Sequence, residues 1–170
     1  KALTALEACG WKGVGVEDVL DGRTVAYPLH LLECCMVSDG GGAVLVASAE
    51  MARNARKKPV WIIGGGEATK YRENGGDITV SAGAQSGPVA FHDAGVSPSE
   101  IDILMVYDSF TITVLTMIED LGFCAKGEGG ALVSDGRLAF DHPLKPALNT
   151  GRRRLSSHQP APKDILVWME

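Results

Sequence analysis

The chain has 170 residues, 45% of them hydrophobic, which is enough for one domain with a real core and too few for two independent ones. Its formal net charge of −5 argues against a nucleic-acid-binding protein, and its apolar runs are far shorter than the roughly 20 residues of a membrane helix. We therefore expect no nucleic-acid partner and no membrane span.

The four cysteines have neither CxxC spacing nor a Cys/His set suited to a metal, so no metal site is expected. We interpret them as reduced, buried thiols of an intracellular protein: Cys9, Cys34, Cys35 and Cys124. The start, KALTALEACGWKG, lacks the pattern of a signal peptide. The expected location is cytoplasmic, with a peroxisome or another organelle as alternatives.

The first part of the chain predicts two buried strands around one helix. A first helical turn is expected at Val16–Leu20, and the apolar, β-branched run at 42–48 predicts a strand buried on both faces. Ser48 is suited to capping the following helix, which Pro59 would end. The run VWIIGGG at 60–66 predicts the second strand.

The second part predicts further alternation of helices and strands. A long loop is expected over 67–86, then a helix that begins near Pro88 and ends at Gly95, with Val89, Phe91 and Ala94 on its apolar side. A turn with a capping pattern, in which Ser97 precedes Glu100 by three residues, leads to a strand at 103–110. The stretch 111–123 is β-branched but has helical periodicity, and we assign it as a helix ending at Gly122. One side of this helix is apolar (Ile112, Leu115, Ile118 and Leu121) and the other polar (Thr113, Thr116 and Asp120). An extended piece at 146–150 completes an α/β layered fold.

The end of the strand ILMVYDSF is the first place to look for chemistry, because ligands gather at the carboxyl ends of strands in α/β folds. Asp108 could act as a general base, a hydrogen-bonding anchor or a helix N-cap, and Tyr107 as a phenolic acid or a half-buried core ring. The glycines of IIGGGEA lack the spacing of a dinucleotide fingerprint, and SDGGGAVLV lacks the Lys-Ser/Thr of a phosphate-binding loop.

Four segments, taken in order, resemble the C-terminal half of thiolases, most closely the sterol-carrier or lipid-transfer type. They are ECCMVSDGGGAVLVAS, SGPVAFHDAGVSPSEIDILMVYDSFT, EDLGFCAKGEGGALVSDG and NTG…LSSHQP. The resemblance covers about residues 20–160. It implies part of a layered αβαβα architecture, with residues 1–57 ending the N-terminal half and 58–170 forming an incomplete C-terminal domain.

The resemblance also implies a set of site residues. In thiolases a nucleophilic cysteine of the N-terminal half attacks an acyl-CoA thioester, and the C-terminal half completes the site. The catalytic positions then fall on Tyr107, Asp108, His158 and Gln159, and substrate would be bound by Phe110, Asn149, Gly151, Ser86 and Gly87. The nucleophile-bearing half is missing, and Cys34 and Cys35 lie outside its sequence context.

The stretch NTGRRRLSSHQP departs from the family's glycine-rich turn before a catalytic Gly-His-Pro. The histidine position falls on Gln159, with His158 one place early, and Arg152–Arg154 replace glycines. Three explanations stay open: a remodelled turn in a divergent enzyme, an inactive relative, or an aberrant chain end.

The function that the resemblance implies is that of an acyltransferase on acyl-CoA thioesters, acting by Claisen-type bond formation or thiolytic cleavage, and inactive as this chain alone. The alternatives are a thiolase-like retro-aldolase and a non-catalytic partner subunit. No tightly bound cofactor is expected, and coenzyme A would be substrate or product. The implied partners are an acyl-CoA and either a second copy or a subunit that supplies the nucleophile.

Overall fold

The computed structural model describes residues 15–35, 43–69, 76–134, 137 and 147–149. Within them the elements follow in the order α2 (Val16–Leu20), β1 (Thr24–Ala26), β2 (Leu29–His30), η1 (Leu31–Glu33), α3 (Ala49–Arg53), α4 (Gly83–Ala94), η2 (Pro98–Glu100), β3 (Ile103–Met105), α5 (Thr111–Asp120), α6 (Gly129–Ser134) and β4 (Ala147–Asn149). None of the helices in these residues is long and apolar enough to cross a membrane.

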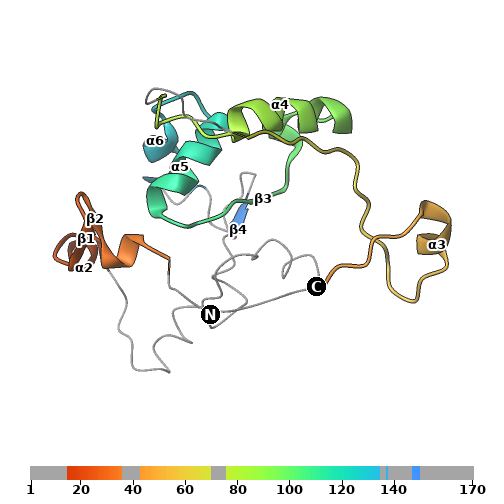
Figure 1. Cartoon of the computed structure of the whole chain (residues 1–170), viewed down its shortest axis with the longest axis horizontal. Helices are drawn as coiled ribbons and strands as arrows, with labels where there is room; N and C mark the ends of the chain where they lie inside the picture. Colours follow the sequence, from red (N-terminus) through yellow and green to blue (C-terminus); the bar gives the residue numbers. More distant parts are fainter. Residues whose placement is uncertain (1–14, 36–42, 70–75, 135–136, 138–146, 150–170) are drawn as a thin grey trace.

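The core of the described chain forms where α5 packs against β3. Leu104 and Val106 from the strand segment meet Val114 and Ile118 from the helix, and all four are buried. Side chains that are partly buried extend this cluster: Met117, Leu121, Phe123, Cys124, Leu132 and Val133. The predicted packing role of Cys124 is therefore confirmed. Helices α4, α5 and α6 gather around this core (Figure 1).

Helix α5 confirms that periodicity decides over β propensity in this stretch, and Gly122 follows its end with a φ of +83°. The predicted apolar face is shifted, however. Val114 and Ile118, four residues apart, are the buried positions, whereas Ile112 in the first turn is exposed. Asp120, expected on the polar face, has only 3% of its side chain exposed.

Helix α4 begins at Gly83, five residues before Pro88, so the prediction that Pro88 opens it is wrong. At this earlier start the Ser81 Oγ accepts a hydrogen bond from the Gly83 N–H at 3.1 Å, and the Ser81 N–H donates to the distant Asp120 carboxylate at 2.6 Å. The end at Gly95 is confirmed, with a φ of +68° that favours glycine. Val89, predicted on the apolar side of this helix, is exposed. Phe91 packs edge-on against Phe123, with 6.3 Å between the centroids of the two rings.

The predicted strands at 42–48 and 60–66 are wrong for the described residues 43–48 and 60–66, which have no regular secondary structure. The large apolar side chains of both runs are exposed: Val44, Leu45, Val46, Val60, Trp61, Ile62 and Ile63. The sheets formed by described residues contain only β1 with β2 and β3 with β4, so neither run has a strand neighbour there. A buried-strand pattern needs such a neighbour to satisfy its backbone groups.

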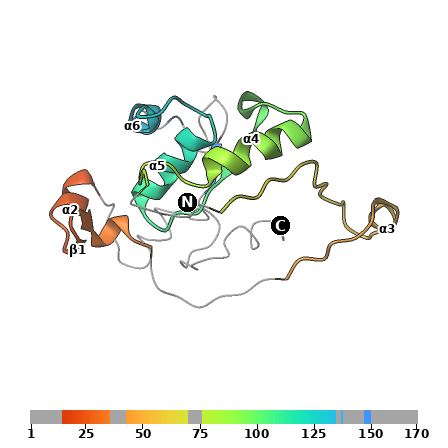
Figure 2. The ribbon, with the colours of Figure 1, turned by 45° about the horizontal axis from the view of Figure 1, so that its top comes forward.

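Glycine lets the segment 60–69 lie against α4 (Figures 1 and 2). A Cβ atom on Gly66 would stand 2.2 Å from the Ser86 carbonyl oxygen, and one on Gly64 would stand 2.6 Å from that of Ala90. The Gly65 N–H donates to the Asp93 carboxylate at 3.1 Å. Gly64 and Gly66 thus allow the backbone of this segment to approach α4 closely.

The helix predicted to end at Pro59 ends instead at Arg53, with Asn54 as its C-cap, and the strand predicted at 103–110 ends at Met105. Three other local predictions are confirmed. Ser48 caps α3, accepting a hydrogen bond from the Met51 N–H at 3.3 Å, and Val16–Leu20 is helical. Ser97 and Glu100 form the expected capping pattern around η2. In both views α3 stands apart from the helices around the core, and so does the α2 and β1 region (Figure 2).

Candidate active-site loop after strand β3

Strands β3 and β4 are parallel, with Met105 paired to Asn149. The carboxyl ends of parallel strands meet at the same sheet edge, so the chain that leaves β3 toward Tyr107 begins beside Asn149, the last residue of β4. The structure therefore brings together the backbones of two predicted site segments that are far apart in sequence. Of the extended piece expected at 146–150, residues 147–149 form β4, and residues 146 and 150 lie outside the described residues.

The loop 106–110 connects β3 to α5 and carries two of the four predicted catalytic residues, Tyr107 and Asp108. Val106 is buried and anchors its start. Tyr107 and Asp108 are half-buried, and Ser109 Oγ lies 3.1 Å from Thr113 Oγ1 in the first turn of α5. Phe110 occupies the N-cap position with 39% of its surface exposed. The interpretation of Asp108 as the N-cap is therefore wrong.

Tyr107 is half-buried, so its ring can pack against the protein while its hydroxyl acts as an acid, which are the two roles predicted for it. Burial raises the pKa of its phenol, and the nearby Cys35 side chain raises it further. The carboxylate of Asp108 acts in the same direction. A raised pKa keeps the phenol protonated at neutral pH, so this group can donate a proton or a hydrogen bond.

Cys34 and Cys35 contact this loop, which corrects their interpretation as buried core thiols. Both are partly buried. Cys34 forms an isolated antiparallel bridge with Phe110, and the Cys35 N–H donates to the Ser109 carbonyl at 2.9 Å. No local pattern in the sequence indicates this pairing, because it joins segments on opposite sides of the predicted boundary at residue 57.

Ser86 and Gly87, predicted to bind substrate, lie on α4 near the other end of α5. Ser86 Oγ donates to the Ala82 carbonyl at 3.3 Å, and a Cβ atom on Gly87 would stand 2.7 Å from Leu121. Leu121 follows the last residue of α5, whereas Tyr107 precedes the first, and a ten-residue helix is about 15 Å long. The structure does not bring these two residues to the loop 106–110.

His158, Gln159, Gly151 and the three arginines lie outside the described residues, as does Cys9. Within the described part of the chain, no three His, Cys, Asp or Glu side chains come together in a way that could hold a metal ion. The geometry that can be assigned to a site is thus the loop 106–110, the end of β4 and Cys34–Cys35.

Comparison with known proteins agrees with this arrangement. A family model described as "Thiolase C-terminal domain-like" matches residues 69–163. An acetyl-CoA acetyltransferase of Methanothermobacter thermautotrophicus is 39% identical over 139 residues, covering 79% of this chain and 36% of the relative. A steroid side-chain-cleaving aldolase of Thermomonospora curvata is 36% identical over 132 residues, covering 74% of this chain and 34% of the relative.

A solved structure, "Ltp2-ChsH2(DUF35) aldolase", superposes with a TM-score of 0.71 at 32% identity, over 86% of this chain and 42% of that one. This likeness supports the expected α/β thiolase-like fold, present here in part. The chain spans about a third of the length of the curated relatives it matches. Since the family model covers more than half of the chain, we conclude that the chain belongs to the thiolase family.

Proposed function

We propose that the protein to which this chain belongs makes or breaks a carbon–carbon bond next to the carbonyl of a CoA thioester, with Tyr107 as proton donor. The observation that carries the proposal is a half-buried phenol with a raised pKa, on the loop between β3 and α5 and at the sheet edge shared with β4. Family membership supplies the substrate class, with coenzyme A as substrate or product.

The chemistry needs a proton donor at that point. Cleavage of the bond between Cα and Cβ leaves an electron pair on the thioester as an enolate, and bond formation leaves negative charge on an oxygen. A protonated phenol can deliver its proton to the first or hydrogen-bond the second. Asp108 would then hold the loop in place and help to keep Tyr107 protonated, since its negative charge raises the pKa of Tyr107.

Acyl transfer of the thiolase kind needs a cysteine thiolate as nucleophile. Burial raises the pKa of the Cys124 thiol, and Cys34 Sγ donates to the His30 carbonyl at 3.3 Å, so neither is an activated nucleophile in this fold. We propose that the nucleophile comes from a first half, of which residues 1–57 are the end, and that residues 58–170 belong to the second half. We further propose that the protein forms a homodimer or binds a partner subunit that supplies the nucleophile-bearing half.

A retro-aldol reaction is the second candidate, favoured by the same observation. It needs an acid or base at the β-oxygen and the enolate rather than an acyl-cysteine, and a tyrosine can serve there. Two similar proteins carry the word aldolase in their names, which supports this candidate without deciding it. The name of the similar structure also joins two components, which supports a partner subunit.

The test compares Tyr107→Phe with wild type in the complete protein, using a β-ketoacyl-CoA with free CoA and, separately, a β-hydroxyacyl-CoA. Turnover of the first substrate indicates thiolysis, and cleavage of the second indicates a retro-aldolase. We expect Tyr107→Phe to lower kcat by about 10²-fold or more on the substrate that is used. Tyr27→Phe is the matched control, because Tyr27 is 94% exposed in the β1–β2 turn.

An unchanged rate for Tyr107→Phe removes this residue from the mechanism. If the complete wild-type protein turns over neither substrate, the non-catalytic interpretation replaces the proposal.

A further inference from the structure

Main-chain contacts anchor the loop that carries Tyr107 at both of its ends. The loop starts from β3, which is paired with β4. Near its other end, Phe110 forms an antiparallel bridge with Cys34. The Ser109 carbonyl beside it accepts a hydrogen bond from the Cys35 N–H at 2.9 Å. Tyr107 therefore lies between two anchors, and the second anchor is the chain that leaves η1.

One carboxylate closes the turn that leads to this second anchor. Glu33 Oε2 accepts a hydrogen bond from the His30 N–H at 2.8 Å, and the same oxygen lies 2.9 Å from His30 Nδ1. On the other side of the turn, Cys34 Sγ donates to the His30 carbonyl at 3.3 Å. The hydrogen bonds from the His30 N–H and imidazole lower the pKa of Glu33, so its carboxylate is ionised at neutral pH. A 3-10 helix of three residues has poor hydrogen-bond geometry of its own, so a turn this short depends on such contacts at its ends.

We propose that Glu33 is a positioning residue for Tyr107. By holding His30 at the start of η1, its carboxylate fixes the turn that pairs with the end of the loop, and so limits where the loop can place the phenol. The inference rests on the proposed function of Tyr107. It gives Glu33 a role that no motif in the sequence indicates, and this role involves no contact with substrate.

Hydrogen exchange of the complete protein, followed by mass spectrometry, tests the role of Glu33 in the loop without any assay of activity. Glu33→Ala removes both hydrogen bonds from His30, so the turn opens more often and the Cys35 amide loses protection. We expect the peptides that contain Cys35 and Tyr107 to exchange at least about tenfold faster, the equivalent of one hydrogen bond to a charged group. Glu33→Gln keeps a carbonyl oxygen that can accept one of the two hydrogen bonds, so its exchange rate should lie between those of wild type and the alanine variant.

Glu100→Ala is the matched control, because Glu100 holds η2 in the same way. Its carboxylate accepts hydrogen bonds from the Ser97 N–H at 2.9 Å and from Ser97 Oγ at 2.8 Å, but η2 lies outside the turn that bridges to Phe110. This variant should leave exchange in the peptide that contains Tyr107 as in wild type. The inference is overturned if Glu33→Ala exchanges like wild type in that peptide, or if Glu100→Ala speeds exchange there as much. Circular dichroism reports whether each variant folds, and Glu33→Gln keeps the test valid if the alanine variant does not.

Activity of the complete protein gives the second readout. We expect Glu33→Ala to lower kcat by about tenfold with little change in KM, and Glu33→Gln to recover part of the loss, because a misplaced proton donor weakens the transition state rather than substrate binding. Faster exchange with an unchanged kcat would also overturn the positioning role. The two proposals fail separately: an unchanged rate for Tyr107→Phe removes the proposed function, whereas hydrogen exchange still reports whether Glu33 holds the loop.

Discussion

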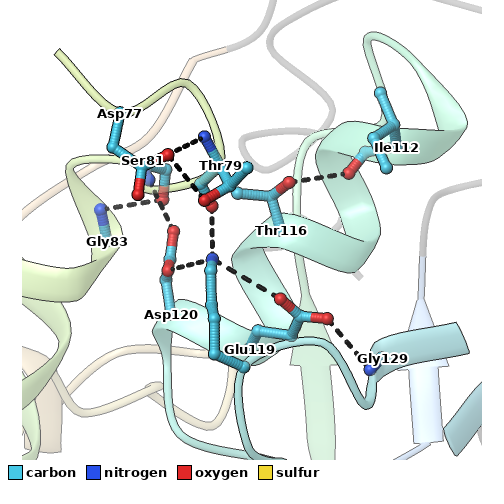
Figure 3. A network of polar contacts seen from close by, with 10 residues as sticks. Asp77, Thr79, Ser81, Gly83, Ile112, Thr116, Glu119, Asp120 and Gly129 are labelled. Carbon is cyan, nitrogen blue, oxygen red and sulfur yellow. Dashed lines mark hydrogen bonds and ion pairs between the residues drawn. The ribbon is translucent and has the colours of Figure 1, made fainter.

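Asp120 should contribute strongly to stability, because it is almost fully buried and joins three segments (Figure 3). One carboxylate oxygen accepts a hydrogen bond from the Ser81 N–H at 2.6 Å, and the other accepts one from Lys126 Nζ at 2.8 Å. Lys126 also donates to the Thr79 carbonyl and lies 3.4 Å from the Glu119 carboxylate. The carboxylate thereby ties the start of α4 and the loop before α6 to the end of α5.

Asp120→Asn keeps the shape and tests the charge. Whichever way the new amide turns, its NH₂ group faces one of two donors, Ser81 N–H or Lys126, so one hydrogen bond is always lost. A hydrogen bond to a charged group is worth about 1.5–3 kcal/mol, so we expect a loss of about 2–3 kcal/mol in the free energy of unfolding. Asp102→Asn is the control: it makes the same change in an exposed side chain, so it should alter the free energy of unfolding by about 0.5 kcal/mol or less.

Urea unfolding followed by circular dichroism measures both variants, and the pH dependence provides a second check. Burial raises the pKa of Asp120, but hydrogen bonds from Lys126 and Ser81 outweigh it, so the net pKa is lowered. A lowered pKa gives stability that is fully present above the unfolded value of about 3.9 and is lost as pH falls through the folded value. The difference between wild type and Asp120→Asn should therefore be level at neutral pH and shrink below about pH 4. An Asp120→Asn chain as stable as Asp102→Asn at pH 7 would falsify this reasoning.

Two further predictions concern packing. Gly66→Ala should lower the free energy of unfolding by about 1–3 kcal/mol, because its Cβ would stand 2.2 Å from the Ser86 carbonyl oxygen. Gly65→Ala is the control and should be nearly neutral, because a Cβ atom there meets no atom within 4 Å. Hydrogen exchange of the α4 amides would locate the effect, and an equal loss of stability in the two variants would contradict it. Ile118→Ala should lower the free energy of unfolding by about 2–5 kcal/mol, because the side chain is 0% exposed. Ile112→Ala, at an exposed position of the same helix, should change it by about 0.5 kcal/mol or less. Thermal melts compare the two variants, and similar losses would show that Ile118 is not part of the core.

The sequence predicts local structure best where the signal is local. The helix at 111–120, the Ser48 cap, the Gly95 end and the Ser97–Glu100 capping pattern all depend on residues within one or two turns of each other. The start of α4 escapes prediction because it depends on Ser81, whose N–H bonds to Asp120, distant in the sequence. A local rule that places proline in the first helical turn cannot detect that contact.

The runs at 42–48 and 60–66 show a different limit. Their composition indicates that these residues favour burial, which is a property of the side chains alone. Whether a strand forms depends on a neighbouring strand, and among the described residues none pairs with 43–48 or 60–66. The pattern shows that the side chains of these runs favour burial, but it does not show which segment would cover them or pair with them as a strand. The short helix at Gly129–Ser134 is not predicted, because its two glycines favour a turn over a helix.

The candidate site combines both situations. Tyr107 and Asn149 follow or lie in segments that the sequence predicts to be extended, and the parallel pairing of β3 with β4 brings those segments together. The contact of Cys34 and Cys35 with this loop cannot be found in this way, because it depends on a bridge between residues 34 and 110. The loop is thus fixed at its start by β3 and near its end by a segment from before the predicted boundary at residue 57. If that boundary holds in the complete protein, the loop with the proposed proton donor belongs to one half and the segment paired with it to the other, so the course of the loop would depend on how the two halves pack.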